Sequence, residues 1–130
     1  MTVTANKIER PKILIADDQA DIILALEALL KNKGYEIRSE TSPAAVLEAL
    51  EASSFDLILM DLNYSRQTSS VREGIDLLTR IGEIDPLIPV IVMTAWGSID
   101  LAVEAMNIGA ANFIQKPWDN ARLIELVRDC

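Results

Sequence analysis

Five polar residues of the sequence could act together, because each lies close to the C-terminal end of a short apolar run. They are Asp17, Asp18, Asp61, Thr94 and Lys116. Carboxylates brought together either share protons or bind a cation, and hard oxygen ligands suit Mg²⁺. An aspartate can attack phosphorus, while an ammonium and a hydroxyl stabilise the charged oxygens of a phosphoryl group. The chain contains no histidine, so this set favours phosphoryl chemistry at a metal site over chemistry that needs an imidazole base.

Each of these residues also has an ordinary structural explanation. Asp17 and Asp18 suit the start of a helix, where acidic side chains cap the helix and complement its dipole. An aspartate after a strand is usually a turn residue, and a lysine before a proline is usually solvated. Thr94 is of a type common in strands. Only the combination of these residues at four strand ends favours chemistry.

The elements that must position these residues alternate between short apolar runs and longer segments of helical period. Strands are predicted at Lys12–Ala16, Tyr35–Ser39, Asp56–Met60, Leu87–Met93 and Ala111–Gln115. The second run alternates and is expected at a sheet edge. Such alternation is typical of right-handed βαβ units. The predicted fold class is α/β, a single doubly wound five-stranded parallel sheet in the order 2-1-3-4-5 flanked by five helices, which is the flavodoxin-like arrangement.

A helix is expected after each strand. Ser42 and Asp119 are predicted N-caps, and Gly34 and Gly109 are predicted to end the first and fourth helices. The apolar residues expected to face inward are Ile22, Ile23, Leu26, Leu29 and Leu30, then Val46, Leu47 and Leu50, then Ile75, Leu77, Leu78 and Ile81, then Ile99, Ala102, Val103 and Met106, and finally Leu123, Ile124 and Val127.

This topology predicts where the polar residues meet. In an open parallel sheet, ligands bind beyond the carboxyl ends of the strands, at the point where the strand order reverses. For the order 2-1-3-4-5 that point lies between the first and third strands. Asp17 and Asp18 leave the first strand and Asp61 leaves the third, so we expect the three carboxylates in one pocket. Thr94 and Lys116 would reach it from the fourth and fifth strands.

On these residues the chain resembles the receiver domains of bacterial two-component response regulators over essentially its whole length. The residues that carry the resemblance are Asp17-Asp18, Asp61, Thr94 followed by Ala95, and Lys116-Pro117. The resemblance implies that Asp61 accepts a phosphoryl group from a sensor histidine kinase and that Thr94 and Lys116 contact this group. It also implies Mg²⁺ or Mn²⁺ held by Asp18, Asp61 and the backbone carbonyl of Asn63, with Asp17 nearby or bound through water, and a cis Lys116-Pro117 bond.

The resemblance also implies a switch. Phe113 matches an aromatic residue that turns inward when the Thr94 hydroxyl moves toward the phosphoryl group, which remodels the surface of the fourth helix, fifth strand and fifth helix. Partners read that surface. Such a domain is not an enzyme beyond its own phosphorylation and slow dephosphorylation. The runs 93–98 and 109–117 are similar to receivers of NtrC-type activators, which implies AAA+ and DNA-binding domains after the receiver, a role in transcription, and a homodimer through the fourth and fifth helices.

Two features depart from the family pattern. The polar segment from Asn63 to Arg72 is a long loop. The stretch from Asn63 to Gly74 is about five residues longer than the usual loop after the acceptor and lacks its Met-Pro pair. Trp96 places a bulky side chain two residues after Thr94, where size affects the access of water to an acyl phosphate. We therefore expect slow self-dephosphorylation, tuned by Trp96 and by Asn63. A phosphoryl half-life that did not shorten in Trp96→Ala would contradict this expectation.

The bulk properties limit the classes of function. A length of 130 residues fits one domain, which we place at residues 11–130 after a flexible leader at 1–10. The net charge of −8 argues against direct nucleic-acid binding. The single cysteine, Cys130, suits a reducing compartment, and no apolar run is long enough for a membrane span. A cytoplasmic location is therefore expected.

Two other functions remain open on the sequence. One is an interaction module that keeps the receiver fold but works without phosphorylation. The other is a phosphatase with an aspartyl nucleophile, although Asp17-Asp18-Gln19 lacks the Asp-x-Asp spacing of such enzymes after the first strand.

Overall fold

The computed structural model of the chain describes residues 10–62, 72–95 and 99–130. The described residues form β1 (Lys12–Ala16), α1 (Ala20–Lys31), β2 (Glu36–Glu40), α2 (Pro43–Ala52), β3 (Leu57–Asp61), α3 (Arg72–Ile84), β4 (Val90–Thr94), α4 (Ile99–Asn107), β5 (Asn112–Gln115) and α5 (Asn120–Asp129). All neighbouring strands pair in parallel, in the order β2-β1-β3-β4-β5. The predicted flavodoxin-like α/β fold is confirmed. Within these ranges, no helix combines the length and the apolar composition that a bilayer crossing requires.

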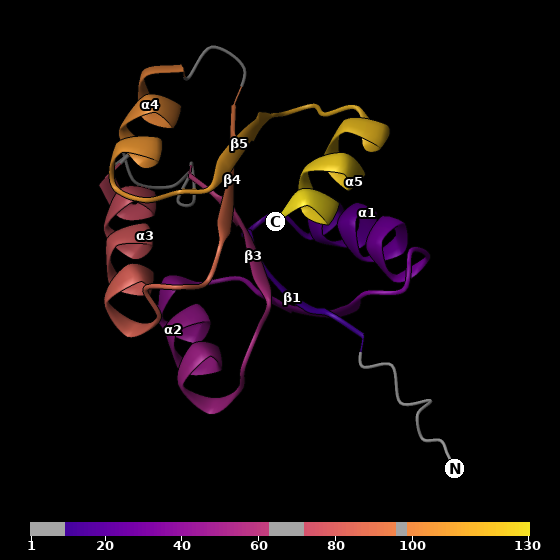
Figure 1. Ribbon diagram of the computed structural model, residues 1–130, viewed down its shortest axis with the longest axis horizontal. Helices are drawn as coiled ribbons and strands as arrows, with labels where there is room; N and C mark the ends of the chain where they lie inside the picture. The colour runs from indigo at the N-terminus through magenta and orange to yellow at the C-terminus, as the bar shows by residue number, and fades with distance from the viewer. Residues whose placement is uncertain (1–9, 63–71, 96–98) are drawn as a thin grey trace.

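The sheet separates two core layers. Helices α1 and α5 cover one face, and α2, α3 and α4 cover the other (Figure 1). Alternate residues of each central strand point to opposite layers: Ile13 and Leu59 pack toward α1 and α5, whereas Leu14 and Ile58 pack toward α2 and α3. Because both faces are covered, the central strands are nearly continuous apolar runs. Strand β2 is half-exposed at the edge, as predicted.

The predicted helix ends are found in the structure. The Ser42 side chain accepts a hydrogen bond from the Ala45 backbone N–H at 3.2 Å, and Asp119 accepts one from Arg122 at 3.1 Å. Gly34, with a φ of 93°, follows α1 and lies in the left-handed region that favours glycine. The N–H groups of Gly34 and Tyr35 donate to the carbonyls of Lys31 and Leu30, which is the pattern of a Schellman motif. Gly109, with a φ of 119°, ends α4 in the same way.

The predicted inward face of α4 is right for Ala102 but wrong for its three larger residues. Ile99, Val103 and Met106 are 46%, 52% and 38% exposed, whereas Ala102 and Ala105 are fully buried against the sheet. Large apolar side chains were assigned to the core because of their hydrophobicity. In the folded protein, the small alanines form the stripe that faces the sheet, and the larger residues lie on an adjacent stripe in solvent. In the other helices, the predicted inward residues are buried or partly buried in the two layers.

Some strand boundaries also differ from the prediction. Strand β4 begins at Val90 rather than Leu87, because Pro89 has no N–H for the ladder. Leu87 itself is 89% exposed in a turn, and its backbone N–H donates to the Asp85 side chain. Strand β2 begins and ends one residue later than predicted, and β5 begins one residue later. Strand β3 begins at Leu57, also one residue later than predicted. Asp61 and Thr94 lie at the C-terminal ends of β3 and β4, as predicted.

Candidate functional site

The carboxyl ends of the strands bring the polar residues together. Asp17 follows β1, Asp61 ends β3 and Thr94 ends β4, and all three are fully buried. Backbone hydrogen bonds connect these ends, from Leu62 N–H to the Met93 carbonyl at 2.9 Å and from the Lys116 N–H to the Thr94 carbonyl at 2.8 Å. The sheet itself therefore fixes the relative positions of the site residues.

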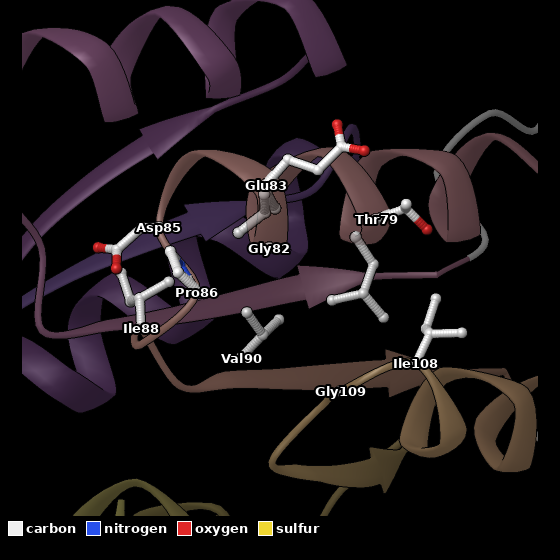
Figure 2. A pocket seen from close by; sticks show the side chains of 11 residues that line it. Thr79, Gly82, Glu83, Asp85, Pro86, Ile88, Val90, Ile108 and Gly109 are labelled. Atoms are coloured by element: carbon white, nitrogen blue, oxygen red, sulfur yellow. The ribbon is translucent and has the colours of Figure 1, made fainter.

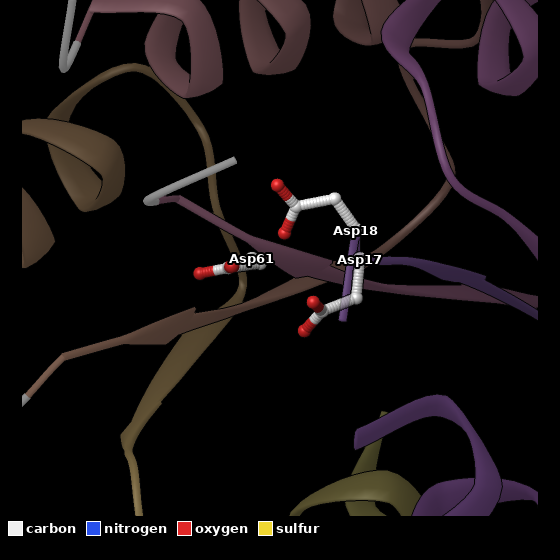
Figure 3. Close-up of side chains that lie close together, drawn as sticks. All are labelled: Asp17, Asp18 and Asp61. Carbon is white, nitrogen blue, oxygen red and sulfur yellow. The ribbon is translucent and has the colours of Figure 1, made fainter. Parts of the chain in front are cut away.

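Three carboxylates form an acidic cluster at this edge. Ligand oxygens of Asp17, Asp18 and Asp61 all lie within 4.8 Å of one another, and Figure 3 shows the side chains gathered at the ends of β1 and β3. Asp18 is the most accessible of the three. Three hard oxygen donors with one side open to water are the kind of ligand set that Mg²⁺ takes from proteins. The cluster fits the predicted metal.

Lys116 joins the cluster from the end of β5. Its Nζ atom lies 3.0 Å from Asp17 Oδ2, 3.3 Å from Asp61 Oδ2 and 3.3 Å from Gln19 Oε1. Three carboxylates and one ammonium leave a formal charge of −2 among Asp17, Asp18, Asp61 and Lys116. Because uncompensated charge is costly in a buried place, this balance favours the binding of a divalent cation.

The Thr94 side chain lies buried beside this cluster, at the end of β4. Among the described residues, its Oγ1 atom has no hydrogen-bond partner. A buried hydroxyl without a partner costs roughly 1–3 kcal/mol. The hydroxyl is therefore a donor available to a group that enters the site.

The structure describes some of the remaining predicted site residues but not others. Phe113, on β5, is partly buried against the core layer of α2, α3 and α4. The peptide bond between Lys116 and Pro117 is cis. Asn63 and Trp96 lie outside the described residues, as do most of the Asn63–Arg72 segment and nearly all of the predicted leader, so their predicted roles stay predictions.

Two residues next to the site were not singled out from the sequence. Gln19 accepts a hydrogen bond from Lys116, and a Cβ atom at Gly74 would overlap the backbone carbonyl of Leu62, the residue after Asp61. The sequence offered one signal for each residue. Gln19 stands where a helix prefers Ser, Thr, Asp or Asn, and Gly74 is a glycine inside a helix.

A pocket of about 350 Å³ lies far from this cluster. It is bounded by the last turns of α3, the start of β4 and the turn after α4, with Val90, Ile88, Ile108 and Gly109 among its lining residues (Figure 2). Val90 begins β4, whereas Asp61 and Thr94 end their strands. The pocket therefore lies at the amino ends of the strands, opposite the acidic cluster at their carboxyl ends. It belongs to a different part of the molecule from the acidic cluster.

Comparison with known proteins agrees with this geometry. The family model of the response regulator receiver domain matches residues 13–128. The chain belongs to this family, as the resemblance of its motifs indicated. It is therefore a receiver domain of the kind found in two-component response regulators.

The relatives narrow the type of receiver. The chain is 36% identical over 115 residues to the transcriptional regulatory protein ZraR of Klebsiella oxytoca, covering 88% of this chain and 25% of that protein. It is 38% identical over 120 residues to the response regulator protein PilR of Pseudomonas aeruginosa, covering 92% and 26%. The receiver domain of NtrX from Brucella abortus superposes with a TM-score of 0.83 at 30% identity, over 90% of this chain and 95% of that one. The resemblance to NtrC-type receivers is confirmed, and the chain spans about a quarter of the length of these curated relatives.

Proposed function

We propose that this receiver domain accepts a phosphoryl group on Asp61 from a phosphohistidine of a sensor histidine kinase. The observation that carries the proposal is the position of the Lys116 ammonium, 3.3 Å from Asp61 Oδ2 within the acidic cluster. An aspartate with a cation at its side and a metal-binding set around it has what a phosphoacceptor needs, because phosphoryl transfer depends mainly on positioning and charge neutralisation.

The transfer step needs no base in this chain. An Asp61 carboxylate oxygen forms the new bond to phosphorus while the bond from phosphorus to the kinase's imidazole nitrogen breaks. The imidazole leaves with the electron pair and takes up a proton from solvent. Asp18 and Asp61, with Asp17 nearby, would hold the Mg²⁺ ion, which supplies positive charge to the phosphoryl oxygens when bound. Lys116 and the Thr94 hydroxyl would stabilise the same oxygens.

Phosphorylation would then shift the domain between two packings. The available Thr94 hydroxyl gains a partner only in the phosphorylated state, and a ligand shifts an equilibrium by the difference between its contacts in the two states. Phe113 lies on β5, which pairs with the strand of Thr94 and forms part of the surface of α4, β5 and α5. We infer that Phe113 responds to the movement of Thr94 and that partners read this surface.

The relatives support a role in transcription for the whole protein. ZraR is named a transcriptional regulatory protein, and this chain matches about a quarter of its length. We infer that the receiver controls AAA+ and DNA-binding output domains, works in the cytoplasm and does not contact DNA itself. Its own chemistry would be confined to phosphorylation and slow dephosphorylation of Asp61.

The proposal is tested by incubating the chain with acetyl phosphate and Mg²⁺ and measuring its intact mass. We expect one added phosphoryl group, lost in Asp61→Asn and when EDTA removes the metal. Asp56→Asn is the matched control. Asp56 directly precedes the same strand at its amino end, where its side chain accepts a hydrogen bond from the Lys12 N–H, so this variant should label normally.

The other functions predict different results. Hydrolysis of a phosphomonoester with turnover would support the phosphatase instead. Neither labelling nor turnover would support the phosphorylation-independent interaction module. Labelling that persists in Asp61→Asn would place the acceptor elsewhere and contradict the proposal.

A further inference from the structure

Gln19 contacts both the acidic cluster and Lys116. It is the N-cap residue of α1, yet its side chain makes no capping hydrogen bond. Its Oε1 atom instead accepts a hydrogen bond from Lys116 Nζ at 3.3 Å, and its backbone N–H donates to Asp17 Oδ1 at 2.9 Å. One residue thus fixes a carboxylate through its backbone and the ammonium through its side chain.

The contacts of Lys116 explain why a neutral acceptor is useful here. An ammonium has three N–H donors, and its Nζ atom has three oxygen neighbours, from Asp17, Asp61 and Gln19. A lysine side chain is long and flexible, so each acceptor restricts the volume in which its charge moves. The amide of Gln19 does so without adding negative charge to a cluster that already has a formal charge of −2.

The comparison of Gln19 with a typical N-cap strengthens this interpretation. Ser, Thr, Asp and Asn are preferred at that position because their short side chains reach the first N–H groups of the helix. Gln19 gives up this contribution to helix stability. Its amide reaches Lys116, which is 97 positions away in sequence, across the site instead.

We propose that Gln19 is a positioning residue for Lys116: its amide oxygen holds the ammonium beside Asp61, so that the charge is in place when the phosphoryl group arrives. The inference rests on the proposed function, because it concerns the rate of phosphoryl transfer to Asp61. The Gln19 side chain acts through Lys116, whereas its backbone N–H holds Asp17.

Two substitutions separate positioning from packing and capping. Gln19→Met keeps the length of the side chain but removes its amide oxygen. Gln19→Asn keeps the amide but is one methylene too short for Lys116, and it is a better N-cap. In both variants we expect the rate of labelling by acetyl phosphate, measured by intact mass at saturating Mg²⁺, to fall about three- to tenfold, as for the net loss of one typical hydrogen bond.

Mg²⁺ affinity is the second readout. Neither substitution changes the charge of the cluster, so the Kd for Mg²⁺, measured by isothermal titration calorimetry, should stay within about twofold of the unsubstituted chain. Thermal melting should show Gln19→Asn at least as stable as the unsubstituted chain. A packing role predicts that Gln19→Met labels at the original rate, and a capping role predicts the same for Gln19→Asn. Either result, or Mg²⁺ affinity that falls in step with the rate, would overturn the proposal.

A double-substitution cycle tests the route of the effect. In a Lys116→Ala background, Gln19→Met should change the labelling rate by less than about twofold, because the group through which Gln19 acts is gone. An equal slowing in both backgrounds would contradict positioning. If the unsubstituted chain is not labelled on Asp61, the proposed function fails; if it is labelled and both Gln19 variants match it, only this inference fails.

Discussion

The Thr94 hydroxyl shows how a residue at the site differs from its neighbours in the core. The strand places it at the end of β4 in full burial, and among the described residues no atom accepts its hydrogen or donates to its oxygen. Such an arrangement lowers stability, since a buried polar group has lost its water without gaining a partner. A phosphoryl oxygen on Asp61 would supply that partner.

Thr94→Val should therefore keep or raise the free energy of unfolding while it slows the labelling of Asp61. The isosteric methyl group removes an unpartnered hydroxyl, so we expect the free energy of unfolding in urea to stay the same or rise by about 1 kcal/mol. The labelling rate should fall several-fold because one stabilising donor is lost. Thr79→Val is the control, since that hydroxyl donates to the Ile75 carbonyl on α3, and its labelling should not change. A slower Thr79→Val, or an unchanged Thr94→Val, would argue against the role of Thr94.

At the level of elements, the approach of α3 to β3 depends on one glycine. A Cβ atom at Gly74 would overlap the backbone carbonyl of Leu62, which is rigid and follows Asp61 directly. Helix α3 can therefore start this close to the end of β3 only without a side chain at position 74. The helix has a second glycine, Gly82, where a Cβ atom would meet nothing within 4 Å.

The two glycines make a matched pair of substitutions on one helix. Alanine is the better helix former by about 1 kcal/mol, so Gly82→Ala should raise the free energy of unfolding by roughly 0.5–1 kcal/mol. Gly74→Ala should lower it by about 1–3 kcal/mol, because the backbone must shift, and the labelling rate should fall as Asp61 moves with Leu62. Urea unfolding of both variants tests this. A Gly74→Ala chain more stable than the original would show that the close approach is not required.

At the scale of the whole molecule, α4 leaves an apolar stripe in solvent. Ile99, Val103 and Met106 are all more than a third exposed on it. Contiguous exposed apolar side chains on one helix often mark a contact surface. The family resemblance implied a homodimer through the fourth and fifth helices, and this stripe supports that proposal.

The proposed dimer gives a prediction on mass in solution. The phosphorylated chain should show concentration-dependent dimerisation by light scattering coupled to gel filtration. Val103→Glu should weaken the dimer at least tenfold, because it places a charge in an apolar contact. Leu24→Glu introduces the same charge at another exposed apolar residue, 66% exposed on α1, and should dimerise normally. Equal dimerisation of the two variants would exclude the α4 stripe as the contact.

Much of this protein could be predicted from its sequence because local patterns encode local structure. Continuous apolar runs predicted the central strands, Ser42 and Asp119 predicted helix starts, and the alternation of elements predicted a parallel sheet. The sheet order then placed Asp17 and Asp61 at the same edge, since parallel strands have their carboxyl ends together. The acidic cluster was in this sense predictable from the order of elements along the chain.

Tertiary packing decided what no local pattern contains. The stripe of α4 that faces the sheet is set by how closely the helix can approach, so Ala105 is buried and Val103 is not. The contact of Gln19 with Lys116 and the contact of Gly74 with the Leu62 carbonyl join residues from different elements. The sequence by itself determined which elements form and which strand ends hold the acidic, hydroxyl and lysine side chains. Which side chains touch there depends on the distances between packed elements, and these are fixed only when the whole core assembles.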